Sequence, residues 1–159
     1  SATVIDQIAN NTGKAGGIIG RVNGNASGSS IENCYTSGDI NAIGGGNAGG
    51  IVGKVDGGKL VIKNCIAWNS MLVSTDKAKV GRIVGGTANA TYENCYAYDG
   101  MILKAGEATF TVSDETSPSG SSFQGVAKSA NELKNTVINW DSSLWKEGGN
   151  GYPVFKWSK

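Results

Sequence analysis

The octet NCYTSGDI at residues 33–40 decides how this chain folds, because it returns as NCIAWNSM at 64–71 and as NCYAYDGM at 94–101. The chain has 159 residues and only three cysteines, and each cysteine is the second residue of an octet. Successive cysteines lie 31 and 30 residues apart, a separation too regular for chance and too long for a compact metal knuckle. Self-similarity with a period of roughly 20 to 50 residues indicates a repeat architecture.

Two further segments recur with the octet. One is a glycine-rich block, found as AGGIIGRV at 15–22, AGGIVGKV at 48–55 and VGRIVGGT at 80–87. The other is a short apolar patch that begins six residues after each cysteine, at Ile40, Met71 and Met101. These segments are too short for helices, and β-branched residues flanked by Gly, Asn, Asp and Ser are typical of strands between turns. We therefore predict an all-β fold, a right-handed parallel β-solenoid (β-helix) of about three coils with three strands in each coil.

Stacked coils place equivalent residues above one another, about 4.8 Å apart. The octets then give two ladders, one of Cys34, Cys65 and Cys95 and one of Asn33, Asn64 and Asn94. We expect the cysteines to point into the core, because an unpaired thiol behaves as a small apolar group. We expect the asparagines at a corner, where their amides can bond to the backbone or to one another. An odd number of cysteines, no C-x-x-C spacing and no histidine argue against a disulfide framework or a zinc site.

The pairing of the two blocks resembles a known family. A GGIVG block followed by I-x-N-C-Y-x-x-G-D-I is similar to the GLUG-motif repeat, and the similarity covers residues 15–112. The third repeat carries Arg82 where a glycine is usual, so we expect the last coil to be modified to meet a cap. GLUG repeats occur in large surface and secreted bacterial proteins, including adhesin-like proteins and regions of some immunoglobulin A peptidases. The resemblance implies an exported protein, located at the cell surface or outside the cell.

We divide the chain into a repeat region at 1–112, with coils at about 16–48, 49–80 and 81–112, and a final part at 113–159. The final part is predicted to contain a linker, a short helix and a C-terminal cap packed on the solenoid. Ser129 can begin a helix over 130–135, with Glu132 completing a capping box. The W-D-x-x-x-W and G-Y-P-x-x segments resemble the ending that follows such repeats in surface proteins of gut Bacteroidetes. We expect six apolar residues there to cover the open end of the solenoid: Trp140, Leu144, Trp145, Tyr152, Val154 and Phe155.

Composition excludes several classes of partner. With 14 basic and 13 acidic residues, the chain has neither the footprint of a nucleic-acid-binding protein nor a polybasic membrane anchor. It has no apolar run of about 18 residues, so we expect no membrane insertion of this segment. The glycine clusters lie between strands rather than before a helix, so we read them as turns and expect no bound cofactor. The chain begins with Ser1 rather than methionine, and we expect it to be flanked by further sequence of a larger protein.

Catalytic chemistry has little support in the sequence. The chain contains no histidine, which excludes Ser-His-Asp and Cys-His arrangements. Glycoside hydrolysis would need two carboxylates about 5 to 9.5 Å apart. Asp39 and Asp99 lie two coils apart, which strand spacing places at roughly 9.6 Å, with Ser70 between them. This spacing permits a catalytic pair without singling one out, so we expect no enzyme activity, no catalytic residues and no metal site.

An aromatic strip is the candidate ligand site. If the cysteines point inward, strand alternation turns the residues one and three positions later outward. The outward aromatic residues are then Tyr35, Trp68, Tyr96 and Tyr98. Aromatic faces beside Asn and Asp side chains suit stacking and hydrogen bonding to a sugar. The alternatives are that a loop, a neighbouring module or a parent domain covers the strip, or that the parity changes at the Asn corner and these residues are core.

These observations favour a non-catalytic module, secreted or displayed on a bacterial surface, for adhesion or glycan contact. The expected partner is a host or dietary glycan, or a host surface protein. One alternative is a structural stalk or spacer of a larger surface protein, and another is a glycan-cleaving β-helix enzyme. A solenoid scaffold does not by itself specify which of these is correct.

Overall fold

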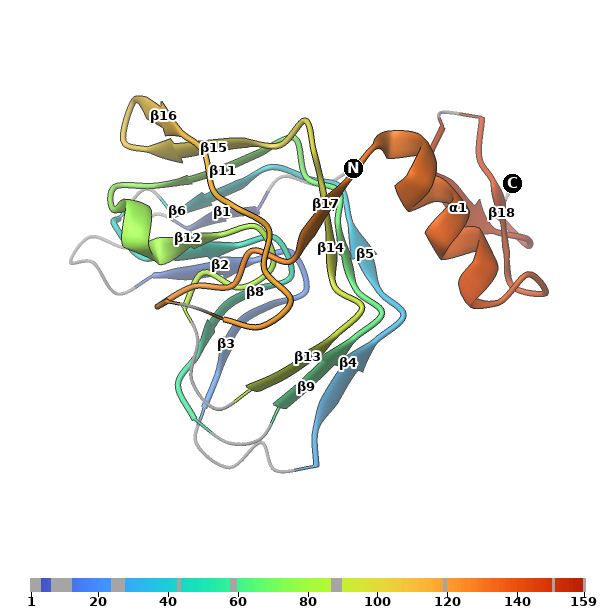
Figure 1. Cartoon of the computed structure of the whole chain (residues 1–159), viewed down its shortest axis with the longest axis horizontal. Helices are drawn as coiled ribbons and strands as arrows, with labels where there is room; N and C mark the ends of the chain where they lie inside the picture. Colours follow the sequence, from blue (N-terminus) through green and yellow to red (C-terminus); the bar gives the residue numbers. More distant parts are fainter. Residues whose placement is uncertain are drawn as a thin grey trace.

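The computed structural model is a mostly β structure with one α-helix, and it describes residues 4–6, 13–23, 28–42, 44–57, 60–86, 90–118, 120–149 and 151–158. Figure 1 shows a β-solenoid of about three coils, with the helix beside it. The predicted fold class is confirmed.

Each of the first two coils has five strands within the described residues. The first coil contains β2 (Lys14–Gly16), β3 (Ile19–Val22), β4 (Ser30–Glu32), β5 (Tyr35–Thr36) and β6 (Ile40–Ala42). The second contains β7 (Asn47–Gly49), β8 (Val52–Val55), β9 (Leu60–Lys63), β10 (Ile66–Ala67) and β11 (Met71–Ser74). Three strands per coil were predicted. The difference arises because a bend divides each glycine-rich block into two strands and the Asn corner separates the octet from the strand before it.

The third coil leads into the rest of the chain. It contains β12 (Val80–Gly81), β13 (Ala90–Glu93), β14 (Tyr96–Tyr98) and β15 (Ile102–Ala105), preceded by a short 3-10 helix (Lys77–Lys79). The remaining elements are β1 (Val4–Asp6), β16 (Ala108–Phe110), β17 (Val126–Lys128), α1 (Ala130–Trp140), β18 (Trp145–Glu147) and β19 (Pro153–Phe155).

Equivalent strands of successive coils pair in parallel and form the walls of the solenoid. The sheet orders are β1-β6-β11-β15-β16, β17-β14-β10-β5, β12-β7-β2, β13-β9-β4 and β3-β8. Among the described strands of these walls, β16 alone runs antiparallel to its neighbour, because it forms a hairpin with β15. Strands β18 and β19 form a separate antiparallel hairpin. Residues at equivalent positions of the repeat pair with each other across the coils. Tyr35, for example, lies beside Ile66, and Ile66 lies beside Tyr96.

The asparagine ladder forms a corner of every coil. Asn33, Asn64 and Asn94 have φ values of 54°, 50° and 50°, in the left-handed region that Asn tolerates better than most residues. The amide of Asn64 donates to Oδ1 of Asn33 at 3.1 Å, and the amide of Asn94 donates to Oδ1 of Asn64 at 3.2 Å. The prediction of stacked asparagines at a corner is confirmed. The backbone turn and the side-chain ladder therefore depend on the same residue.

The cysteine ladder lies on the core side of this corner. Cys65 and Cys95 are buried, and their thiols donate to the carbonyl oxygens of Ile31 and Ile62, each at 3.4 Å. Burial raises the pKa of Cys65 to about 12 and that of Cys95 to about 11, so both thiols stay protonated near neutral pH. All three cysteines are free. The predicted role as small core residues is confirmed for Cys65 and Cys95, whereas Cys34 is half-buried.

Close packing at the glycine-rich block explains its paired glycines. A Cβ atom at Gly49 would overlap the carbonyl oxygen of Val52, and one at Gly50 would lie 2.5 Å from the Cβ of Ala67. The backbone of this block thus passes too close to its neighbours for any side chain. The core beside it is filled by aliphatic residues that recur from coil to coil, such as Ile51, Ile62 and Ile83.

The Asn ladder gives a testable prediction at its middle rung. Asn64→Ala should lower the free energy of unfolding by about 2 to 4 kcal/mol, because it strains the left-handed backbone and removes two side-chain hydrogen bonds. Asn64→Gly should lose only about half as much, because glycine adopts positive φ without strain. Denaturant unfolding of both variants measures the difference. Equal losses would mean that the left-handed corner contributes nothing to stability.

Candidate functional site

The four candidate aromatic residues lie on three neighbouring strands of one solenoid wall. Tyr35 is in β5, Trp68 follows β10, and Tyr96 and Tyr98 are in β14. They share an apolar cluster with residues of α1 and of the final hairpin, separate from the two clusters inside the solenoid. The outward orientation that strand alternation predicted is therefore present. The alternative was that the Asn corner shifts the inward–outward alternation of side chains and places these aromatic residues in the core. That alternative is wrong, because they lie outside the solenoid.

The chain itself covers this aromatic strip. Helix α1 packs against the wall formed by β5, β10, β14 and β17 (Figure 1), and its Leu133 and Val137 are fully buried there. Trp68 is only 4% exposed and contacts Tyr152, with ring centroids 4.8 Å apart. Trp68 is thus not accessible for stacking a sugar, and Tyr35, Tyr96 and Tyr98 are half-buried. Apolar rings outside the solenoid are better buried against the amphipathic helix than left in water.

The tyrosines of the strip are held at their edges. The hydroxyl of Tyr35 donates to the carbonyl oxygen of Pro153 at 2.6 Å, and its ring lies 5.8 Å from that of Trp145. Lys128 places its ammonium 3.6 Å from the ring centre of Tyr96, a cation–π contact. Burial, together with the neighbouring Tyr152, raises the pKa of Tyr35. Tyr35 therefore attaches the final hairpin to the first coil. The contact between Lys128 and Tyr96 attaches the segment before α1 to the third coil.

Three of the six residues expected to cover the open end of the solenoid cover its side instead. Trp140, Trp145 and Tyr152 pack on the aromatic strip, whereas Leu144 and Phe155 are exposed. The helix that carries the first of them begins at the predicted capping box, in which Ser129 and Glu132 bond to each other's backbone. It continues to Trp140, five residues beyond the predicted end. The extra turns supply Val137 and Trp140 to the covered face.

The end of the solenoid above the third coil is closed by Phe123 and its neighbours, which lie in the part at 113–159 that was predicted to contain a linker. Phe123 is buried, and its backbone pairs with Val84 in both directions, at 2.9 and 3.1 Å. Its ring lies 4.1 Å from that of Tyr92. Phe123 therefore occupies the place that an aliphatic residue of a fourth coil would take above Val84.

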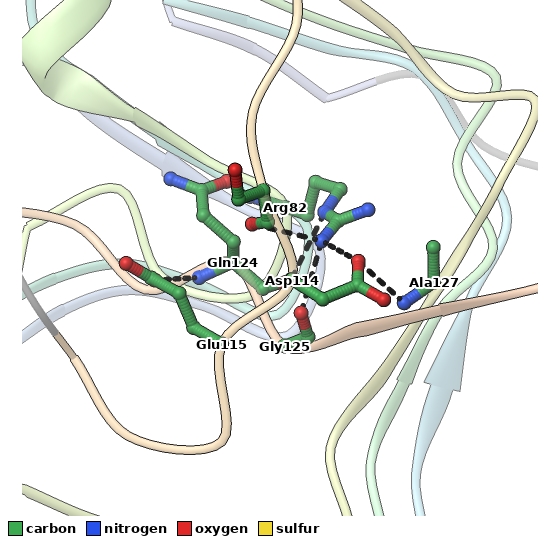
Figure 2. A network of polar contacts seen from close by, with 7 residues as sticks. Arg82, Asp114, Glu115, Gln124, Gly125 and Ala127 are labelled. Carbon is green, nitrogen blue, oxygen red and sulfur yellow. Dashed lines mark hydrogen bonds and ion pairs between the residues drawn. The ribbon is translucent and has the colours of Figure 1, made fainter.

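Arg82 anchors this closing segment, as Figure 2 shows. Its Nε donates to the carbonyl oxygen of Gln124 at 3.1 Å, and its Nη2 donates to the carbonyl oxygen of Gly125 at 2.9 Å and to Asp114 at 2.8 Å. Its own backbone N–H donates to the side chain of Gln124 at 3.0 Å. The expectation that Arg82 modifies the last coil to meet a cap is confirmed. A buried guanidinium is tolerable here because carbonyl oxygens and a carboxylate satisfy it.

Asp114 links Arg82 to the strand that follows. Its carboxylate also accepts a hydrogen bond from the backbone N–H of Ala127 at 3.0 Å. Burial acts to raise the pKa of Asp114, but the hydrogen bonds from Arg82 and Ala127 and the charge of Arg82 outweigh it and lower that pKa. The carboxylate is therefore ionised throughout the neutral range. Glu115 adds a further bond by accepting the N–H of Gln124 at 2.9 Å.

A groove lies between the first coil and the final hairpin. Its volume is about 450 Å³, and its lining includes Ile18 and Cys34 on the solenoid side and Trp145 and Phe155 on the hairpin side. Three aromatic rings continue from it into solvent. Trp145 stacks on Phe155 with centroids 4.2 Å apart, and Phe155 stacks on Trp157 at 4.5 Å and 6°. Trp157 is 66% exposed, so this aromatic stack, unlike the predicted strip, is open to a partner.

Sequence reasoning missed this aromatic stack, although it contains Phe155 and Trp157 at alternate positions of one short strand and turn. Their spacing was a usable signal, because alternate residues lie on one face of an extended segment. Within the described parts of the chain, no group of three or more His, Cys, Asp or Glu could hold a metal ion. No described helix is long and apolar enough to cross a membrane.

The covered strip yields a prediction with an internal control. Trp68→Ala should lower the free energy of unfolding by about 3 to 5 kcal/mol, because it leaves a cavity beneath α1 and the hairpin. Trp157→Ala, which truncates an exposed ring, should change stability by no more than about 0.5 kcal/mol. Urea unfolding followed by circular dichroism measures both. A mild effect of Trp68→Ala would mean that α1 is not firmly packed on the wall.

The lowered pKa of Asp114 predicts an acid-sensitive anchor. A carboxyl whose pKa is lower in the folded than in the unfolded state stabilises the fold above its unfolded value, about 3.9. That contribution disappears as the pH falls through the folded pKa. Unfolding measured from about pH 6 to about pH 2.5 should therefore show a steeper loss of stability for the natural protein than for Asp114→Asn. Identical pH profiles would exclude a stabilising Arg82–Asp114 contact.

Comparison with known proteins gives one informative similarity. No protein-family model matches the chain, and no curated protein does. Among solved structures, the chain is 38% identical to a Bacteroides ovatus protein provisionally named an immunoglobulin A1 protease, with a TM-score of 0.75. The similarity covers 100% of this chain and 56% of the other, so this chain spans little more than half the length of that neighbour. Sequence and fold are thus shared with one part of a longer protein.

Proposed function

We propose that this chain is a non-catalytic end module of an exported bacterial β-solenoid protein. The observation that carries the proposal is the aromatic strip, whose rings are packed under α1 and the final hairpin rather than offered to a ligand. Covered rings are what a structural module needs, because they fix a cap to the solenoid wall. The proposal favours the stalk or spacer reading over ligand binding at Tyr35, Trp68, Tyr96 and Tyr98.

Export rests on two lines of support. The GLUG-like repeats resemble those of surface and secreted bacterial proteins, and the solved neighbour comes from Bacteroides ovatus. The chain carries three free cysteines, of which the two most buried have raised pKa values. Thiols that remain protonated and enclosed resist oxidation, so they are compatible with an exported protein. We accordingly place the module at the cell surface or in the extracellular space.

A catalytic role is disfavoured by the chemistry of the possible nucleophiles. The neighbour's provisional name is that of a protease, but proteolysis needs an activated nucleophile. In this chain Cys65 and Cys95 are held as thiols, far from the thiolate that would attack a peptide bond. The chain has no histidine to activate a serine or a cysteine. We infer that this segment acts by structure or contact rather than by cleavage.

Activity assays test the non-catalytic part of the proposal. Purified protein should leave immunoglobulin A1 and a panel of soluble polysaccharides intact, as judged by electrophoresis and by reducing-sugar release. The polysaccharide panel is included because Asp39 and Asp99 could still act as a carboxylate pair. Cleavage that is lost in Asp39→Asn or Asp99→Asn would replace this proposal with the glycan-hydrolase reading.

A second candidate function is adhesion or glycan contact at a different place. The exposed stack of Phe155 and Trp157 offers flat apolar surface beside the polar Ser158. Exposed aromatic surface of this kind commonly marks a contact site. A host or dietary glycan, or a host surface protein, would fit such a platform. The expected partner is the same as in the sequence analysis, but the proposed contact site is the final hairpin rather than the covered aromatic strip.

A glycan array distinguishes the two candidates. The natural protein is compared with the double variant Phe155→Ala, Trp157→Ala and with Ile102→Ala, a matched control at an exposed apolar residue of β15. Binding that the double variant loses and the control retains would establish the aromatic stack as a contact site. Absence of binding by the natural protein across the array would support the purely structural module. Circular dichroism confirms that each variant is folded.

A further inference from the structure

The first coil differs from the other two in how its core residues are covered. Ile18, Ile51 and Ile83 occupy the same position of the glycine-rich block, and the backbone links them in series. Ile51 and Ile83 are 0% exposed, whereas Ile18 is 44% exposed. The cysteine ladder repeats this difference, because Cys65 and Cys95 are buried and Cys34 is only half-buried. In both ladders, the residue contributed by the first coil, Ile18 or Cys34, is thus partly exposed to solvent.

The backbone of the first coil presents matching hydrogen-bonding groups on this edge. In the upper coils, the N–H groups of Ile66 and Tyr96 donate to the carbonyl oxygens of Cys34 and Cys65, one coil below. The equivalent donor in the first coil is the N–H of Tyr35, which faces away from the second coil. A strand edge of this kind can accept one more parallel strand.

Strand β1 shows where such a further coil would end. Val4 of β1 pairs with Ile40 of β6, just as Ile40 pairs with Leu72 of β11, and both pairings are parallel. Strand β1 therefore holds the last-strand position of a coil that would lie below the first. Among the strands that the structure describes, β2, β3, β4 and β5 have no neighbour below them and are edge strands of their sheets.

The final hairpin provides a wall next to this edge. The groove described above is bounded by Ile18 and Cys34 of the first coil and by Trp145 and Phe155 of the hairpin. Trp145 contacts the outward Tyr35 of the first coil, and Tyr152 contacts Trp68, a different outward position of the second coil. Tyr35 and Phe155 both line the groove, so an outward residue placed below Tyr35 would enter it beside Phe155.

We propose that the open edge of the first coil seats one further solenoid coil of this chain's own octet type, supplied by polypeptide joined to the front of β1. Its Asn-Cys pair would lie below Asn33 and Cys34, an aliphatic residue would cover Ile18, and its outward residue would enter the groove beside Phe155. The added coil continues the stacking interface already present between the three coils. The inference does not depend on whether the module binds a glycan.

The test extends the chain with its own second coil. Residues 47–71 are placed directly before Val4, so that Val4 follows the added coil as Leu72 follows residue 71 in the natural chain. The control carries Ala67→Lys in the added copy, which puts a charge where the inward Ala67 would face Thr36. The readout is the rate at which iodoacetamide alkylates Cys34, followed by mass spectrometry of its peptide.

The extended chain should alkylate Cys34 at least about tenfold more slowly than the natural protein, because local opening must then precede reaction. The control extension should leave the rate near that of the natural protein. Equal rates in the extended chain and its control would overturn the proposal. So would concentration-dependent protection of Cys34 in the natural protein with dimers in sedimentation analysis, since a second copy would then be the occupant.

A peptide keeps the proposal testable if the extended chain does not fold. Residues 60–71 with Cys65→Ala, added to the natural protein, should slow alkylation of Cys34 in a dose-dependent way. The same peptide with Ala67→Lys should not. No difference between the two peptides at millimolar concentration would count against an edge that recognises the octet.

Discussion

The parallel stacking of one coil on the next is the constraint on which the rest of this structure depends. At a spacing of about 4.8 Å, each residue touches its own equivalents above and below, so a side chain must suit a neighbour of the same kind. Asparagine satisfies this rule at the corner because its amide both donates and accepts, as Asn64 does between Asn33 and Asn94. Cysteine satisfies it inside because it is small and apolar, and its thiol reaches a carbonyl of the coil below.

Stacking cannot continue at an end, so an end requires different residues. Gly17 and Gly50 leave room for the coil above them, and Arg82 replaces glycine where no coil follows. The guanidinium extends into the space that a fourth coil would fill and bonds to carbonyl oxygens of the closing segment. Phe123 supplies the apolar part of the closure. Arg82 and Phe123 together therefore replace the stacking surface with a closed end.

The sequence was informative wherever contacts follow the repeat. Asn64 meets Asn33 and Asn94 because the period places them together, so the corner, the buried cysteines and the outward aromatics could all be predicted. The cover of Trp68 could not, because Tyr152 and Leu133 lie far along the chain at separations unrelated to the period. Short sequence motifs predicted only part of the structure around them. The capping box at Ser129 located the start of α1, but its end depended on packing of Trp140 against the hairpin.

The two ends of the solenoid give the module a direction. The end above the third coil is closed by Arg82 and Phe123, while the edge below the first coil keeps Ile18 and Cys34 partly exposed. The same edge borders the groove that leads to Phe155 and Trp157. A coil seated there would bury Phe155 and leave only Trp157, the outermost ring, for a ligand. Growth of the solenoid and contact through the aromatic stack would therefore compete for one surface, and the exposed area of Phe155 determines how far they exclude each other.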